Sequence, residues 1–283
     1  MLNSLSLFWR RFHRRWLYPA ISLVVAIAVL LSVPLRLQAI SITDLIFQGV
    51  QIIQLSNLSD QQEVEIGKQM NAELTSREFR IYNNPTLNAF VNQAGQRLVP
   101  KSDRPNIPYT FQVVADQNVN AFATMGGFVY ITTGLLRLAD NEAQVASVLG
   151  HEIGHIAGRH LVEQLKQVAI QRGVANVAGI DQSELVGIGV ELALNRPNSR
   201  QAEYDADQRG LRTMSGAGYA PSAMVSFMEK LLKGSSGTPE FLSTHPDTGN
   251  RISALKSKIN PSTANRGDGL NSSTYTSRVK SLL

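Results

Sequence analysis

The segment His151-Glu152-Ile153-Gly154-His155 lies inside a stretch of sequence that favours an α-helix. Because an α-helix turns by about 100° per residue, side chains four residues apart lie on one face, about 6 Å apart along the axis. Two imidazoles in this arrangement can bind the same zinc ion. Glu152 points to the adjacent side, where it can contact a water molecule without binding the metal itself.

The spacing of these residues matches the H-E-x-x-H pattern of zinc-dependent peptidases. The alternative interpretation is a chance match. With five histidines in 283 residues, a chance occurrence in one chain is on the order of 1%. We therefore interpret His151 and His155 as two metal ligands and Glu152 as a catalytic residue that acts on water.

The net charge of +5 comes from the beginning of the chain. Five arginines and no acidic residue precede Ile40, and taking these 5 from the 27 Lys and Arg residues leaves 22, equal to the 22 Asp and Glu residues. A basic nucleic-acid-binding surface is therefore not expected, and we predict no nucleic-acid partner. The lack of cysteine excludes disulfides, thiolate metal ligands and a lipoprotein anchor.

Residues 1–39 are typical of a signal peptide or an N-terminal membrane anchor. The cluster Arg10-Arg11-Phe12-His13-Arg14-Arg15 precedes an apolar run, 16–35. Because positive charge stays on the cytoplasmic side, we expect the rest of the chain to be exported, to the periplasm or to the periplasmic face of a membrane. Cleavage and retention both stay open, and a retained segment would make the membrane a partner. A buried core helix is a third interpretation, which Pro19 and Pro34 at the ends of the run disfavour.

Hydrophobic periodicity and turn residues predict a mostly helical chain with a short β-segment. Before residue 140 we expect two helices and then three strands, at 59–80, 85–98, 109–115, 120–124 and 128–133. After it we expect helices at 141–172, 199–215 and 221–233, with a lid or a second pair of helices at 173–195. Residues 261–283, rich in Ser, Thr, Asn and Gly, are expected to form a flexible C-terminal tail.

Three glycines, Gly150, Gly154 and Gly158, recur every four residues along the helix expected at 141–172. Each costs about 1 kcal/mol of helix stability relative to alanine. A smooth stripe of them on one face therefore predicts the close approach of another backbone, from a second helix or from the strand hairpin. The alternative is a chance accumulation of small residues.

A catalytic zinc site needs a third protein ligand and an open position for water. Without cysteine, this ligand must be His, Asp or Glu, and Glu203 is the best candidate. It lies in the first turns of a helix that Ser199 caps. Asp207, four residues later, shares the face of Glu203, where it could accept a hydrogen bond from a ligand histidine. The alternative is a solvated acidic helix face without a metal.

Taken together, these motifs resemble peptidase family M48, a family of zinc endopeptidases that includes the CAAX prenyl proteases and HtpX. The resemblance rests on five groups of residues in the family's order: Asn120-Ala-Phe-Ala with Gly126-Gly127, Thr133-Gly-Leu-Leu136, His151-Glu-Ile-Gly-His155 with His160, Glu203-x-Asp-Ala-Asp207-x-x-Gly210, and Ser243-Thr-His-Pro246 with Arg251. Because no convincing membrane helix follows Leu35, the exported, BepA-like branch fits best.

The resemblance implies an α+β, mostly helical zincin-like metallopeptidase domain at 40–260, with a small β-sheet or hairpin beside the active-site helix. It implies one Zn2+ per chain, held by His151, His155 and Glu203. It also suggests that His245 lies near the zinc, either as a catalytic residue that polarises the scissile carbonyl or as a fourth ligand. The alternative for His245 is a surface loop.

Two further residues of these motifs, Arg251 and His160, are assigned roles other than metal binding. Arg251 is expected to pair with substrate or with site carboxylates, unless it is a simple surface arginine. His160 lies about 140° around the helix from His155, which makes it a poor ligand. We expect it to be structural or to contact a ligand from behind.

The predicted reaction is the hydrolysis of peptide bonds, with Glu152 as general base. We expect substrate to lie extended along 120–123 or 128–131, with Asn120, Ala121, Phe122, Ala123 and Gly127 as substrate-binding residues. Because this mode recognises backbone, it favours unfolded or misfolded exported proteins, in envelope protein quality control. The alternative function is a non-catalytic zinc-containing chaperone or a membrane-anchored assembly factor. The oligomeric state leaves no trace in the sequence.

Overall fold

The computed structural model of this chain describes residues 55, 57–171, 182–234 and 239–279. All of them belong to the second of two units of the chain, Ile46–Leu283. The first unit, Met1–Leu45, and with it the predicted leader at 1–39, lies outside the described residues. No helix in the described ranges combines enough length with enough apolar character to cross a bilayer.

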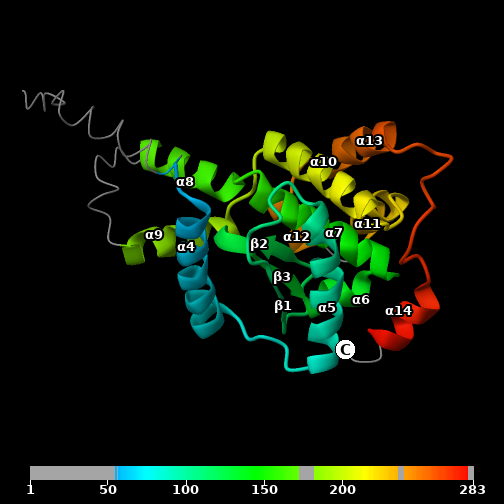
Figure 1. Ribbon diagram of the computed structural model, residues 1–283, viewed down its shortest axis with the longest axis horizontal. Helices are drawn as coiled ribbons and strands as arrows, with labels where there is room; N and C mark the ends of the chain where they lie inside the picture. Colours follow the sequence, from blue (N-terminus) through cyan, green and yellow to red (C-terminus); the bar gives the residue numbers. More distant parts are fainter. Residues whose placement is uncertain (1–54, 56, 172–181, 235–238, 280–283) are drawn as a thin grey trace, which may run out of the picture. The chain divides into compact units, whose positions relative to one another are not determined.

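Helices form most of the described chain, and a small sheet lies among them, which confirms the predicted mostly helical α+β class (Figure 1). Up to residue 138 the elements are α4 (Asp60–Glu73), the π-helical turn η2 (Leu74–Glu78), α5 (Pro85–Leu98), η3 (Val99–Lys101), β1 (Thr110–Val114), β2 (Ala121–Ala123), η4 (Met125–Gly127), β3 (Phe128–Thr132) and α6 (Thr133–Leu138). The following elements are α7 (Glu142–Ala157), α8 (His160–Gln171), α9 (Gln182–Asn195), α10 (Arg200–Gly216), α11 (Ser222–Lys233), α12 (Glu240–Thr244), α13 (Thr248–Lys258) and α14 (Ser272–Arg278).

The strands of the described residues form a three-stranded sheet in the order β1-β3-β2. β1 runs parallel to β3, and β2 runs antiparallel to β3 after the turn η4. β3 is therefore paired on both sides, whereas β2 lies at an edge. In the turn, Gly126 and Gly127 have φ angles of 72° and 98°, a left-handed conformation that glycine adopts without strain.

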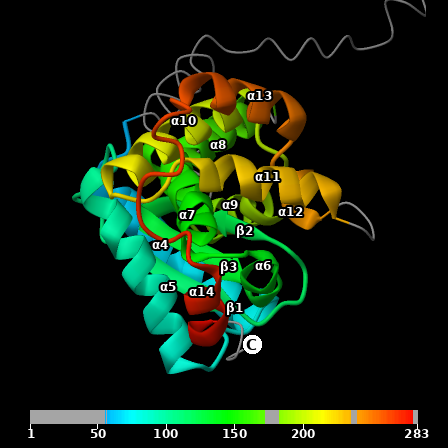
Figure 2. The same ribbon diagram turned by 90° about the vertical axis from the view of Figure 1, so that its right-hand side faces the viewer.

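The helix α7 packs against α10 on one side and contacts β2 and β3 on the other (Figures 1 and 2). At the α10 contact, a Cβ added to Gly150 would lie 3.2 Å from Gly210 O, and one added to Gly154 would lie 2.6 Å from Ala206 O. Any larger side chain at Gly154 would push the helices apart. The predicted close approach of a second backbone is confirmed at both positions, and the second backbone is a helix.

The single helix predicted over 141–172 is wrong, because α7 ends and α8 begins around a turn at Gly158 and Arg159. Arg159 has a φ of 55°, a left-handed conformation that costs about 1–3 kcal/mol for a residue with a side chain. Its guanidinium pairs with the Glu63 carboxylate at 2.5 Å, which offsets this strain. Gly158 differs from the other two glycines, since a Cβ there would meet a side chain, His160 Nε2, at 2.4 Å.

Local capping signals explain why the remaining predicted helices begin where they do. The side chains of Ser59, Asn141 and Ser199 each accept a hydrogen bond from the backbone N–H three residues further along. These bonds satisfy donors that the first turn of a helix leaves free. Pro85 occupies the first turn of α5, as predicted. In the region predicted as a lid or a pair of helices, α9 packs against α8 and α4.

The flexible tail predicted over 261–283 is wrong for its described part, 261–279. This part contains α14, whose Tyr275 is buried and donates a hydrogen bond to Leu136 O at 2.6 Å. The polar composition suggested a loose segment, but Tyr275, the buried Val279 and a hydrogen bond from Ala143 N to Gly269 O hold it on the core. Two other helices that the sequence did not suggest, α12 and α13, lie on either side of His245.

Candidate metal centre and active site

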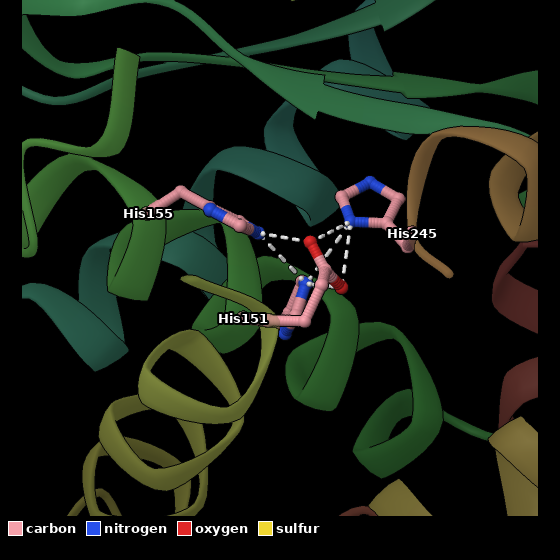
Figure 3. A group of neighbouring side chains, drawn as sticks. His151, His155 and His245 are labelled. Atoms are coloured by element: carbon pink, nitrogen blue, oxygen red, sulfur yellow. Dashed lines mark hydrogen bonds and ion pairs between the residues drawn. The ribbon is translucent and has the colours of Figure 1, made fainter. Parts of the chain in front are cut away.

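Four buried side chains from three parts of the chain converge on one point. His151 and His155 come from α7, Glu203 comes from α10, and His245 follows α12. One donor atom from each lies within 4.8 Å of the others, and among the described residues no other group of metal-binding side chains converges in this way. Figure 3 shows the three histidine rings pointing toward one another around a single carboxylate.

The spacing of the donor atoms fits a tetrahedral metal. Ligands 2.0–2.1 Å from a tetrahedral zinc ion are about 3.3 Å apart. Here His151 Nε2 and His155 Nε2 are 3.0 Å apart, and each lies close to one carboxylate oxygen of Glu203, at 3.5 Å and 3.2 Å. His245 Nδ1 lies 3.2 Å from His151 Nε2 and 3.1 Å from Glu203 Oε1. Its Nδ1 therefore lies at ligand spacing from both His151 and Glu203.

The Glu203 carboxylate is completely buried, with 0% of its surface exposed. Burial alone would raise its pKa, but the three neighbouring histidines lower the pKa of Glu203 well below its usual value. Arg251 adds an ion pair at 2.5 Å from Oε2. Glu203 is therefore an anion at any ordinary pH, as a metal ligand must be.

The outer side of His151 faces Asp207, which lies one turn further along α10 than Glu203. His151 Nδ1 is 2.9 Å from Asp207 Oδ1, so its Nε2 is the atom turned toward the centre. Arg251 holds Asp207 through two hydrogen bonds of 2.7 Å, and only 1% of the arginine is exposed. Burial favours a neutral Asp207, but Arg251 and His151 outweigh it and lower the pKa of this carboxyl.

The outer side of His155 faces another histidine. His155 Nδ1 and His160 Nδ1 are 2.8 Å apart, and His160 Nε2 is 3.1 Å from Asp205 Oδ2. For His155 to present a lone pair on Nε2, its Nδ1 must carry the proton and donate to His160. His160 then donates from Nε2 to Asp205. Burial lowers the pKa of His155 to about 3, which keeps the ring neutral.

Glu152 lies beside the metal ligands without joining them. It is 1% exposed, and its Oε1 accepts no hydrogen bond from a described residue, with His245 Nε2 3.6 Å away. Burial raises the pKa of this carboxyl. A buried carboxylate with a free lone pair and a raised pKa is suited to accept a proton from a water molecule.

The residues predicted to bind substrate are only partly brought together. Phe122 and Ala123 line a cavity together with Glu152, His155 and His245.

The remaining predicted substrate residues do not line that cavity. Asn120 uses its side chain within the protein, since Nδ2 donates to Glu240 Oε1 and Oδ1 accepts from Ala121 N. Gly127 packs on Ile107 and Pro108. The alternative substrate strand, 128–131, is wrong because β3 is paired on both of its edges.

Sequence reasoning missed Asp205 and the wall that α8 gives to the cavity, whereas the wall from α9 lies in the region predicted as a lid or a pair of helices. Asp205 lies midway between Glu203 and Asp207 in the sequence, so a third acid in this short run was a visible signal. Its role depends on His160, which reaches it only because α7 and α10 pack closely.

Comparison with known proteins agrees with this site. Residues 84–259 match the model of Peptidase family M48. The beta-barrel assembly-enhancing protease of Escherichia coli (strain K12) is 31% identical over 221 residues, which cover 72% of this chain and 45% of that protein. The mitochondrial metalloendopeptidase OMA1 of Schizosaccharomyces pombe is 30% identical over 198 residues, or 67% of this chain and 57% of the relative. The chain thus spans about half the length of these curated relatives.

Proposed function

This chain belongs to peptidase family M48 and is a metalloendopeptidase, and on that premise we propose that it uses one Zn2+ to hydrolyse unfolded exported proteins. In this proposal His151, His155 and Glu203 are the protein ligands. The observation that carries it is the separation of 3.0–3.5 Å between their donor atoms, beside the unpartnered Oε1 of Glu152. Two imidazoles and a carboxylate are the donor set of many catalytic zinc sites.

The zinc ion, when bound, polarises the scissile carbonyl and lowers the pKa of water. Glu152 takes a proton from the attacking water and passes it to the leaving amine. Its raised pKa helps the first transfer, because a carboxylate with a higher pKa is a stronger base toward water. Asp207 and His160 keep the rings of His151 and His155 in the tautomers that face the metal.

His245 occupies the corner that water and substrate need. We assign it the role of a fourth ligand that closes the site and withdraws when substrate binds, because its Nδ1 is as close to Glu203 as the other two histidines are. On this assignment, His245→Ala cleaves a short flexible peptide faster than wild type and still binds zinc. A loss of activity with unchanged zinc affinity would instead assign His245 to polarising the carbonyl.

Substrate binds as an added strand along β2 in this proposal. Asn120 and Thr124 bond to β3 through their backbone, so the backbone groups of Ala121 and Ala123 between them point away from the sheet. The Ala121 N–H already donates to Asn120 Oδ1, which leaves Ala123 as the position for an added strand. Ala123 borders the cavity with the catalytic groups. Recognition through backbone groups favours extended, unfolded segments over folded surfaces.

The proposal also covers the cellular setting of the chain. The sequence of residues 1–39 supports export, with the protease domain in the periplasm or on the periplasmic face of a membrane. The printed name of the Escherichia coli relative, beta-barrel assembly-enhancing protease, supports a role in envelope protein quality control.

The test is casein digestion by the purified chain, with the metal content measured on the same samples. Wild type is expected to hold about one zinc per chain, to lose activity with a chelator and to regain it with zinc. Glu152→Gln is expected to keep the zinc and lose at least 100-fold in rate. Glu203→Ala is expected to lose the zinc. If Glu152→Gln digests casein as fast as wild type, the proposed mechanism is wrong.

A further inference from the structure

A cavity extends from the metal centre into the space between the end of α7, the first turns of α8, the last turns of α9 and the edge strand β2. The catalytic groups Glu152, His155 and His245 form part of its lining, and the space between the lining residues is about 590 Å³ when the open solvent at its mouth is included. A peptide bound along β2 with its scissile bond at the metal centre therefore has this cavity directly beside that bond.

The lining of the cavity mixes polar and apolar side chains, and its apolar part comes from three elements. These residues are Phe122 from β2, Leu161 and Val162 from α8, and Leu192 and Ala193 from α9; we call these five residues the apolar pocket. Phe122 is held in place by stacking on Tyr130, with ring centroids 4.6 Å apart. Contact with the apolar pocket favours an apolar side chain, because it removes apolar surface from water on both partners.

The charged groups around the apolar pocket favour an uncharged occupant. Glu63 and Arg159 both reach the cavity, but they pair with each other at 2.5 Å, and Glu63 also pairs with Arg104. Arg196 lies at the exposed rim and adds a positive charge. A lysine side chain entering here would approach Arg196, while the nearby Glu63 is already paired; the other acid of the lining, Glu152, belongs to the catalytic groups.

The apolar pocket exists because of the turn between α7 and α8. At Arg159 the chain adopts a left-handed conformation, so α8 leaves the direction of α7 and a space opens at the end of the metal-binding helix. α9 packs against α8 and closes the far side of this space.

We propose that the apolar pocket is the specificity subsite for the substrate residue next to the scissile bond, and that it selects an uncharged apolar side chain of leucine or phenylalanine size. This inference rests on the proposed function and adds to it the class of sequence that is cut. Glycine at that position leaves the apolar pocket empty, and lysine places a charge against Arg196.

The experiment uses the zinc-loaded full chain and a peptide whose cleavage site is first mapped by mass spectrometry. Variants of the peptide carry Leu, Phe, Gly or Lys next to the scissile bond. Wild type is expected to cleave the Leu and Phe peptides with a kcat/KM at least tenfold above the Gly and Lys peptides, since a hydrophobic pocket discriminates by about 10- to 200-fold. Equal rates for all four peptides would overturn the inference.

Ala193→Phe fills the apolar pocket and is expected to lower the ratio of the rates on the Leu and Gly peptides at least tenfold. Leu194→Phe is the control, because it places a phenylalanine at the next position of α9, which does not line the cavity. It should keep the wild-type preference. If Ala193→Phe does not fold, Leu161→Ala carries the test, since the enlarged pocket should raise the rate on a Trp peptide relative to Leu. An unchanged preference in the folded variant overturns the inference.

Binding separates this inference from the proposed function. Glu152→Gln should bind the Leu peptide at least tenfold more tightly than the Gly peptide, a difference that Ala193→Phe combined with it removes. Selective binding without cleavage by wild type would support the apolar pocket and contradict the peptidase mechanism. Cleavage by wild type together with unselective binding would support the peptidase mechanism and contradict the role of the apolar pocket.

Discussion

The two ligand histidines of α7 are supported from behind by groups that differ in chemistry and burial. His151 faces the carboxylate of Asp207, which Arg251 holds by two hydrogen bonds, and both of these side chains are at most 3% exposed. His155 faces the imidazole of His160, which in turn contacts Asp205, and the Asp205 side chain is 39% exposed.

The two supports have one task in common, and the support behind His151 has a second task of its own. Both fix the tautomer and direction of a ligand ring, which requires only a hydrogen-bond partner at the outer nitrogen. The support behind His151 also neutralises buried carboxylates, since Arg251 contacts Glu203 as well as Asp207. Charges away from water interact strongly, whereas those near the surface are screened. We therefore expect damage behind His151 to cost more than damage behind His155.

Removal of Arg251 tests the support behind His151, where we expect the larger effect. Arg251→Met leaves the carboxylates of Glu203 and Asp207 buried without their cation, and we expect the free energy of unfolding to fall by about 3–5 kcal/mol. Urea denaturation measures this change. Arg212→Met is the matched control, because that arginine is exposed and pairs only with Asp103 at 3.2 Å; it should cost less than about 1 kcal/mol. Similar losses for the two variants would contradict the comparison.

Replacement of the carboxylate behind His151 tests metal affinity. Asp207→Asn keeps the size of the side chain and removes its charge, so His151 loses a strong acceptor. We expect zinc affinity to fall by about 10- to 100-fold, measured by competition with a chelator. Zinc binding indistinguishable from wild type would show that the Asp207 contact does not orient the ring.

The corresponding change behind His155 is expected to have a smaller effect. His160→Gln weakens the acceptor for His155 Nδ1, and we expect zinc affinity to fall by up to about tenfold, at the lower end for such contacts. Asp205→Asn should cost still less, because solvent replaces an exposed carboxylate. Glu163→Gln, on the exposed face of α8, which also carries His160, is the control and should leave zinc binding unchanged. A larger loss for His160→Gln than for Asp207→Asn would reverse the comparison.

The smallest effect is expected at the outer end of the His155 support. Asp205 pairs with Arg209 at 2.6 Å, and Arg209 in turn pairs with Asp103, which is 44% exposed. Asp103→Ala should lower the free energy of unfolding by less than about 1 kcal/mol. The difference from wild type should shrink when melting curves are recorded in high salt. A salt-independent loss would indicate that Asp103 has a packing role.

The sequence predicts the parts of this site that depend on short-range geometry. The four-residue spacing of His151 and His155 fixes their relation within any α-helix, and the caps at Asn141 and Ser199 locate the two helices that carry the ligands. The glycine stripe predicts that a second backbone approaches α7. Each of these inferences needs only residues that lie within one or two turns of one another.

The features that the sequence does not predict depend on long-range packing or on local conformations without a sequence signal. Arg159 is left-handed although nothing in its residue type requires it, because its contact with Glu63 comes from a distant helix. His160 and Asp205 are 45 residues apart, and they meet only through the crossing of α7 and α10. The helix α14 was missed because its polar residues hide the importance of Tyr275.

At Gly150, Gly154 and Gly210 the two ligand-bearing helices touch through main-chain atoms rather than side chains. Main-chain atoms are the same whatever residue the gene encodes, so the spacing between the imidazoles and the carboxylate is insulated from mutational drift in the surrounding core. The spacing is most sensitive at Gly154 and Gly210, where an added Cβ would lie 2.6 Å and 2.9 Å from the facing backbone and would force the two helices apart.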